Sequence, residues 1–209
     1  MTSVEILGLA ASASLLAGWR LYFTVFALGL AMRSGWVDLP GHLATLDVLA
    51  NPWVIGAAAV GAVAEFFADK IMWVDTIWDG IHTFIRPVGG ALITLAVVDP
   101  GDPAWQVMAV LLGGSASLAT HTAKSVARVA VNTSPEPVTN FLLSLLEDGL
   151  TVGLTVLILA YPKTAAIVAV VLLAIAIGLL ILLHRFIRRA LGWWRQRKLG
   201  GGPDSPTAI

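Results

Sequence analysis

Apolar stretches of about 20 residues follow one another along most of this chain, and they limit its possible folds more than any other feature. A helix of that length matches the hydrocarbon core of a bilayer, so each stretch is a candidate transmembrane helix. The stretches are residues 5–32, 52–70, 80–98, 105–123, 138–160 and 164–186. We therefore predict an all-α membrane bundle of six helices that forms one domain over residues 1–190.

The composition narrows the function classes. Only 12% of the 209 residues are charged and the formal net charge is zero, so nucleic acid is not an expected partner. The chain has no cysteine, which excludes disulfides, thiolate metal sites and cysteine nucleophiles. No sequence pattern calls for a cofactor, and we expect none.

The distribution of Lys and Arg predicts the orientation of the helices. Residues 184–198 read HRFIRRALGWWRQRK and carry six bases, so this end should be cytoplasmic and should contact anionic lipid head groups. An even number of helices then places the N-terminus in the cytoplasm as well. Residues 191–209 are expected to form a basic and then disordered cytoplasmic tail.

A weak internal repeat divides the chain into halves, residues 1–100 and 104–190. The tetrapeptide SASL occurs at 12–15 and at 115–118. In each half a base, a proline and a deep acid follow in the same order: Arg20, Pro52 and Glu65, then Lys124, Pro137 and Glu147. Three helices per half would give the inverted repeat of many transporters, and a homodimer would suit so small a bundle.

Charged residues lie deep within the predicted helices, where each costs at least about 2.5–3.5 kcal/mol. They should therefore face the bundle interior and pair with an ion, a solute or another side chain. The candidate ion- or substrate-binding residues are Ser14, Arg20, Glu65, Asp69, Ser117, His121, Lys124, Glu147 and Asp148. The alternative is a structural salt bridge, in which Arg20 or Lys124 balances the acids.

A second polar cluster lies in residues 64–87, where Asp75, Asp79, His82 and Arg86 follow at helical spacing and share one face. Several Trp and Ile residues cover the rest, as in an amphipathic interfacial helix. The polar stripe is either a solvated face or a cytoplasmic vestibule for cations. Asp75, Asp79 and His82 are also candidate metal ligands, because Asp and His one turn apart suit divalent ions.

A third cluster lies in residues 121–137, where His121, Lys124 and Arg128 share a face just before a proline-rich helix start. Such a basic face either binds an anion or anchors the chain on the cytoplasmic side. We assign Lys70, Arg128, Asn132 and Glu136 to the same vestibule as the second cluster.

These two stretches, AEFFADK…WVD…WD…IHTFIRP and HTAK…R…VNTSPEP, resemble the bacterial integral-membrane proteins of domain-of-unknown-function family 4126. The resemblance covers roughly residues 5–185, although Met72 stands where the family has proline. It implies a multi-pass protein of the bacterial cytoplasmic membrane without an assigned activity. It gives weight to Glu65, Asp69, Lys70, Asp75, Asp79, His82, Arg86, His121, Lys124, Asn132 and Glu136.

These features favour a small transporter or channel for an ion or small polar solute, with deep carboxylates able to carry protons. One alternative is a structural or regulatory membrane protein in which charges hold helices together. A less favoured one is an enzyme, either acting on lipid head groups or hydrolytic through GGSAS at 113–117. His121 lies six residues from Ser115, about 240° around a helix, so the two do not form a Ser–His pair.

Overall fold

The computed structural model describes residues 3–36, 47–96, 103–132 and 137–199, and these form helices without a strand. The helices are α1 (Ser3–Trp19), α2 (Leu21–Arg33), α3 (Pro52–Ala68), α4 (Met72–Leu95), α5 (Pro103–Asn132), α6 (Pro137–Ala160) and α7 (Pro162–Leu199). Four of them begin at a proline, which suits the first helical position because the N–H that it lacks would be unpaired there. The predicted all-α fold is confirmed for this part of the chain.

The first predicted helix, residues 5–32, is two helices that meet at Arg20. The backbone of Arg20 has φ −144° and ψ 88°, which is not helical. Near the end of α1, the carbonyl oxygen of Gly18 accepts a hydrogen bond from Arg86 at 3.4 Å, and that of Trp19 accepts one from Lys124 at 3.4 Å. Bases at the negative end of a helix stabilise it, so the break is supported by charges from α4 and α5.

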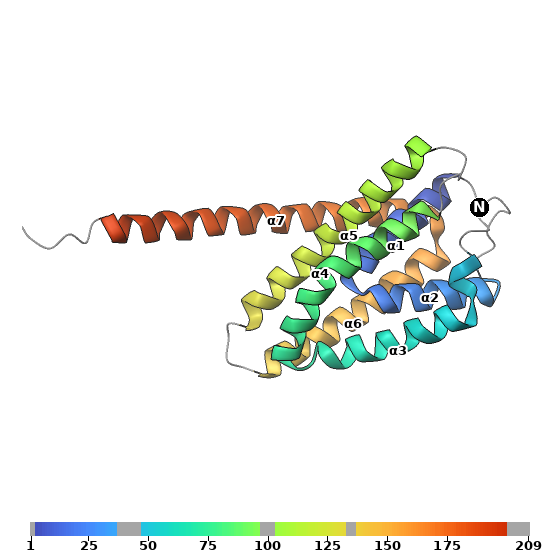
Figure 1. Ribbon diagram of the computed structural model, residues 1–209, viewed down its shortest axis with the longest axis horizontal. Coiled ribbons are helices and arrows are strands. Elements are labelled where there is room, and N and C mark those ends of the chain that lie inside the picture. The colour runs from blue at the N-terminus through green and yellow to red at the C-terminus, as the bar shows by residue number, and fades with distance from the viewer. Residues whose placement is uncertain (1–2, 37–46, 97–102, 133–136, 200–209) are drawn as a thin grey trace, which may run out of the picture.

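The described chain therefore has seven helices rather than six, and this changes the predicted topology. Consecutive helices run in opposite directions, and the start of α1 and the end of α7 lie at opposite ends of the molecule (Figure 1). The prediction that both ends of the chain lie on the same side assumed an even number of helices. The predicted repeat halves also differ, because four helices precede residue 100 and three follow it.

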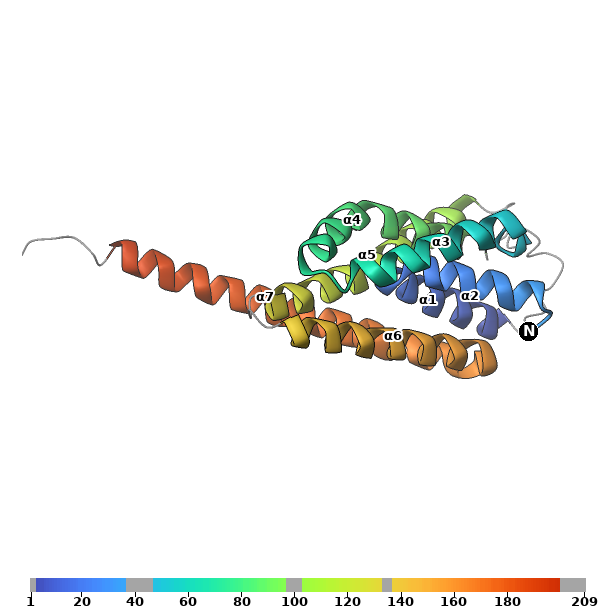
Figure 2. The same cartoon turned by 90° about the horizontal axis from the view of Figure 1, so that it is seen from below.

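Helix α1 occupies the centre of the bundle and contacts α2, α4, α5, α6 and α7. Figure 2 shows α6 along one side, with α1 and α2 between it and α3, α4 and α5. The most extensive contact joins α4 and α5, whereas α5 and α6 touch only slightly. We call α1, α4 and α5 the core of the bundle; α7 packs against α1 and α5, and α6 lies at the side.

Small residues let α1, α4 and α5 cross closely. A Cβ on Gly18 would lie 2.1 Å from the carbonyl oxygen of Ser117, and one on Gly113 would lie 2.6 Å from that of Gly90. Ser14 donates hydrogen bonds to the carbonyls of Gly113 at 2.7 Å and Gly90 at 3.2 Å. The backbones therefore approach as they do in small-residue contacts between membrane helices.

The distribution of polar residues is the reverse of that in a soluble protein. Buried positions include many charged and hydroxyl side chains, whereas large apolar side chains are exposed along α3 to α7. Two segments are long and apolar enough to cross a membrane, Phe141–Ala160 in α6 and Ile167–Phe186 in α7. The predicted bundle of six transmembrane helices is confirmed only to that extent.

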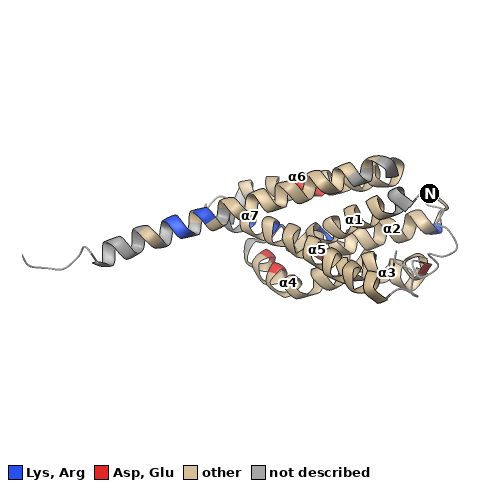
Figure 3. Cartoon of the chain, turned by 90° about the horizontal axis from the view of Figure 1, so that it is seen from above, with Lys and Arg blue, Asp and Glu red and all other residues tan. Residues whose placement is uncertain are grey.

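Helix α7 extends well beyond the rest of the bundle (Figures 1 and 3). Its 38 residues correspond to about 57 Å. Arg185, Arg188 and Arg189 lie on the overhanging part, shown in blue in Figure 3. The helix continues through the basic segment 184–198, and residues 200–209 of the predicted tail lie outside the described residues.

Candidate functional site

Charged side chains from α3, α4, α5 and α6, and from the turns at Arg20 and Lys70, meet at one end of the bundle core. They form ten ion pairs among the described residues. The bases are Arg20, Lys70, Arg86, Lys124 and Arg128, and the acids are Glu65, Asp69, Asp75, Asp79, Glu147 and Asp148. All eleven residues were predicted from sequence, either for binding or for the vestibule. Arg86 of the predicted vestibule pairs with Glu65 of the predicted binding group, so the two groups lie in one network.

Asp69 is the centre of the larger part of this network. It follows the last residue of α3 and is fully buried. Its Oδ2 lies 2.5 Å from Arg20, 3.2 Å from Lys124 and 3.5 Å from Arg128. One base from the α1–α2 junction and two from α5 thus converge on this carboxylate, which is costly to bury unless it is paired in this way.

The adjacent acids of α6 point to different partners, as the 100° turn between neighbouring helical residues requires. Glu147 accepts hydrogen bonds from Nε of Arg128 at 3.0 and 3.2 Å and pairs with its Nη2, while Lys124 lies 3.9 Å away. Asp148 pairs with Arg20 at 2.5 Å and with Lys70 at 2.9 Å. Both acids therefore attach α6 to the core, and Arg128 is the main partner of Glu147.

The partner of Glu65 also differs from the predicted one. Glu65 pairs with Arg86 at 2.7 Å, not with Arg20 or Lys124. Arg86 also lies 3.3 Å from Asp79 and 2.6 Å from Nδ1 of His121. We call Glu65, Asp79, Arg86 and His121 the Arg86 group; Arg86 and Glu65 have no exposed surface.

The protonation of His121 follows from its neighbours. A guanidinium can only donate, so Nδ1 of His121 must accept the bond from Arg86. Nε2 lies 3.0 Å from the hydroxyl of Thr83 and 3.2 Å from the carbonyl of Asp79, so it carries the proton. His121 is therefore neutral in this arrangement and adds no charge to the group.

The stripe Asp75, Asp79, His82 and Arg86 is a single helical face, as predicted, but it is not a solvated one. All four side chains are buried, whereas Trp73, Ile77, Ile81 and Phe84 are exposed. The polar face of α4 turns inward because its charges find partners there, while the apolar face is left outside. An interfacial helix would turn its polar face to water. In the structure the polar face of this segment points into the bundle instead.

His82 and Asp75 have separate surroundings. Nδ1 of His82 lies 2.7 Å from the carbonyl of Trp78, whose ring stacks on the imidazole, and Nε2 lies 3.1 Å from the hydroxyl of Tyr22. Asp75 lies 3.6 Å from Arg128, and burial raises the pKa of its carboxyl to about 7 despite that base. Among the described residues no group of three acids or histidines is arranged to bind a metal, so the predicted metal site finds no support.

The predicted basic face of α5 does not stand open for an anion. His121, Lys124 and Arg128 are all buried, and the two bases pair with Asp69 and Glu147 of the same chain. The side chain of Asn132 and the whole of Glu136 lie outside the described residues.

Ser14 and Ser117 belong to the helix crossing rather than to the charged network. Ser117 donates a 2.8 Å hydrogen bond to the carbonyl of Arg86, and both serines lie beside Gly90. The two SASL segments therefore meet in space. They meet as packing elements, which the sequence pattern could not distinguish from a polar site.

Sequence reasoning missed the uncharged residues that hydrogen-bond the network. Ser125 donates to Asp79 at 2.9 Å, and Lys70 lies 3.1 Å from the hydroxyl of Ser144. Thr83 holds His121 as described above. Each lies one helical turn from a charged residue, for example Ser144 before Asp148, and this spacing is the signal that could have revealed them.

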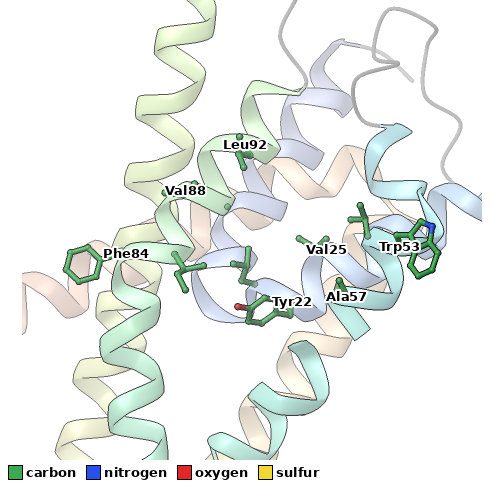
Figure 4. A pocket seen from close by; sticks show the side chains of 12 residues that line it. Tyr22, Val25, Trp53, Ala57, Phe84, Val88 and Leu92 are labelled. Atoms are coloured by element: carbon green, nitrogen blue, oxygen red, sulfur yellow. The ribbon is translucent and has the colours of Figure 1, made fainter. Parts of the chain in front are cut away.

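Two cavities lie on the flanks of the bundle, and both are apolar. One of about 700 Å³ lies between α2, α3 and α4, with Tyr22 at its inner side and Trp53 and Phe84 at its rim (Figure 4). The other, of about 390 Å³, lies between α1, α5 and α7 and includes Ser14. Neither cavity is lined by Glu65 or Glu147, the deep acids predicted to bind an ion or a solute.

Comparison with known proteins gives a family and no activity. No curated protein and no solved structure matches the chain. The family model described as a domain of unknown function, DUF4126, matches residues 7–181 and so spans the helix crossing, the charged network and most of α7 up to its basic end. The chain therefore belongs to the DUF4126 family.

Proposed function

We propose that this protein is a small membrane transporter or channel for an ion or small polar solute, and that the charged network lies on its path. The observation that carries the proposal is a buried ion-pair network around a break between two helices, inside a bundle with an apolar exterior. Broken helices that present their ends to a polar site are typical of transporters. Charges buried at such cost in a membrane bundle usually serve transport of ions or protons.

The arrangement of the charges supports movement of helices. Except for Lys70, the bases lie on α4, on α5 or at the end of α1. Four of the six acids lie on α3, directly after it or on α6. Helix α6 makes modest contacts with the core and is attached to it through Glu147 and Asp148. Neutralising an acid would weaken this attachment, which is how a proton could change the conformation.

The reversed distribution of polar and apolar residues supports a membrane location. By the distribution of Lys and Arg, the charged end of the bundle and the basic end of α7 would face the cytoplasm of a bacterium. The start of α1 would then lie on the other side. The proposal also includes contact between the basic end of α7 and anionic head groups, and a homodimer in the membrane.

The test is proton flux into liposomes that contain the purified protein and a pH-sensitive dye, driven by a potassium diffusion potential. Glu147→Gln and Glu65→Gln should each reduce the flux at least tenfold while the protein stays folded, because glutamine keeps the shape of glutamate without its charge. Asp47 is exposed and belongs to none of the ten ion pairs described above, so Asp47→Asn provides the control. Full flux in both glutamine variants would reject the proposal.

The completeness of the pairing favours a second candidate, a structural or regulatory membrane protein. Every acid of the network has a base within 3.6 Å, and such pairs can simply hold helices together. In that case the liposomes would show no flux above protein-free vesicles, while the glutamine variants would change only the thermal stability.

A further inference from the structure

The Arg86 group contains one more acid than base. Glu65 and Asp79 are both paired with Arg86, at 2.7 and 3.3 Å, and neither has an ion pair with another base among the described residues. His121 is neutral by its hydrogen bonds. With both carboxylates ionised, the group would keep a negative charge in the interior of the bundle.

The surrounding charges do not compensate for it. The rest of the network contains four bases, Arg20, Lys70, Lys124 and Arg128, and four acids, Asp69, Asp75, Glu147 and Asp148. Lys124 and Arg20 lie near enough to act on Glu65, and both pair with Asp69, whose like charge opposes their effect on Glu65. Asp79 has the like charge of Asp75 close to it, as well as His82.

Two carboxylate oxygens of the group also lack a hydrogen-bond partner. They are Oε2 of Glu65 and Oδ1 of Asp79, and both are inaccessible to solvent. Oδ1 of Asp79 is the atom 3.3 Å from Arg86, a contact too poorly aligned to count as a hydrogen bond. Buried carboxylate oxygens without donors are rare in native structures, and a bound proton changes such an oxygen from an acceptor into a donor.

We propose that Glu65 and Asp79 hold one proton between them, so that the Arg86 group is a proton-binding site. Two carboxylates that share one base in a buried site bind a single proton because both cannot remain ionised without an uncompensated charge. The proton adds to a carboxylate oxygen, and Arg86 then serves the other carboxylate alone. This deepens the proposed function, on which it rests for the role of the proton in transport, by naming the coupling ion and its site.

The experiment is infrared spectroscopy of the full-length protein in lipid nanodiscs as the pH is raised from neutral. A protonated carboxyl has a C=O band that is separate from the carboxylate bands. Beyond the contribution of Asp75, we expect a band equivalent to one carboxyl per chain, and this part of the band should be lost in Glu65→Gln and, equally, in Asp79→Asn. Loss in either variant is the signature of sharing, because one acid beside one base is fully ionised.

The controls remove acids outside the group. Asp148→Asn should keep the band, and Asp75→Asn should keep it too, although Asp75 itself contributes a carboxyl that titrates near pH 7. A wild-type protein without a titrating carboxyl band would overturn the proposal, and this measurement needs no variant to fold. A band that disappears only in Asp75→Asn would overturn it as well.

A comparison of sodium and choline salts shows whether the site binds a proton or a metal cation. The band should titrate at the same pH in sodium chloride and in choline chloride of equal ionic strength. A titration displaced to lower pH by sodium would assign the site to a metal cation and overturn the proton. Because the spectrum requires no transport, a normal band with absent flux would reject only the proposed function.

Discussion

Two regions of this bundle bring helices together by opposite means. At the crossing of α1, α4 and α5, glycines and serines allow backbone to meet backbone, and a single added methyl group has no space. At the charged end, long side chains join the helices through ion pairs. A close-packed crossing has one geometry, whereas ion pairs can exchange partners, so the first region is suited to a fixed frame and the second to motion.

The largest effect should come from breaking the crossing. Gly18→Ala puts a Cβ about 2.1 Å from the carbonyl oxygen of Ser117, so α1 and α5 must separate. We expect a loss of about 3 kcal/mol or more, measured by thermal unfolding in detergent. Gly56→Ala and Gly149→Ala are matched controls, since nothing lies within 4 Å of either new methyl group. A Gly18→Ala variant that melts with the wild type would show that the crossing is loose.

Removing a buried base should have an effect of comparable size. Arg86→Met leaves two buried acids without their base and should cost about 3–5 kcal/mol. Glu65→Gln removes the excess charge instead and should cost clearly less. Urea or thermal unfolding of both purified variants measures the two losses of stability. Equal losses would contradict the view that the Arg86 group carries an excess negative charge.

The smallest effect should come from the rim of the network. The side chains of Lys70 and Asp148 remain 13% and 20% exposed, and Asp148 keeps Arg20 as a partner. Lys70→Met should therefore cost no more than about 1 kcal/mol in the same unfolding assay. A loss of stability as large as that of Arg86→Met would mean that water screens the Lys70–Asp148 pair no more than it screens the buried pairs.

The sequence was informative about which residues share a face and less so about where that face points. The spacing of Asp75, Asp79, His82 and Arg86 predicts one stripe, and the structure has it. Periodicity does not say whether a polar stripe faces water or the interior, and here Asp75 and Asp79 find their bases inside the bundle. The interfacial orientation was therefore wrong although the stripe was right.

Partners are harder to predict than positions. Glu65 and Arg86 lie 21 residues apart on consecutive helices, and their contact depends on how α3 and α4 rotate against each other. The break at Arg20 did leave a signal. A stretch over residues 5–32 is longer than one membrane crossing needs, and it contains Gly18 and a charge in its middle.

The position of Arg20 restricts how the bundle can rearrange. One nitrogen of its guanidinium, Nη2, lies 2.5 Å from Asp69 at the end of α3 and 2.5 Å from Asp148 on α6. If these two helices separate by even one side-chain diameter, that nitrogen can follow only one of them. The bundle would then have two mutually exclusive states, one in which Arg20 pairs with Asp69 and one in which it pairs with Asp148.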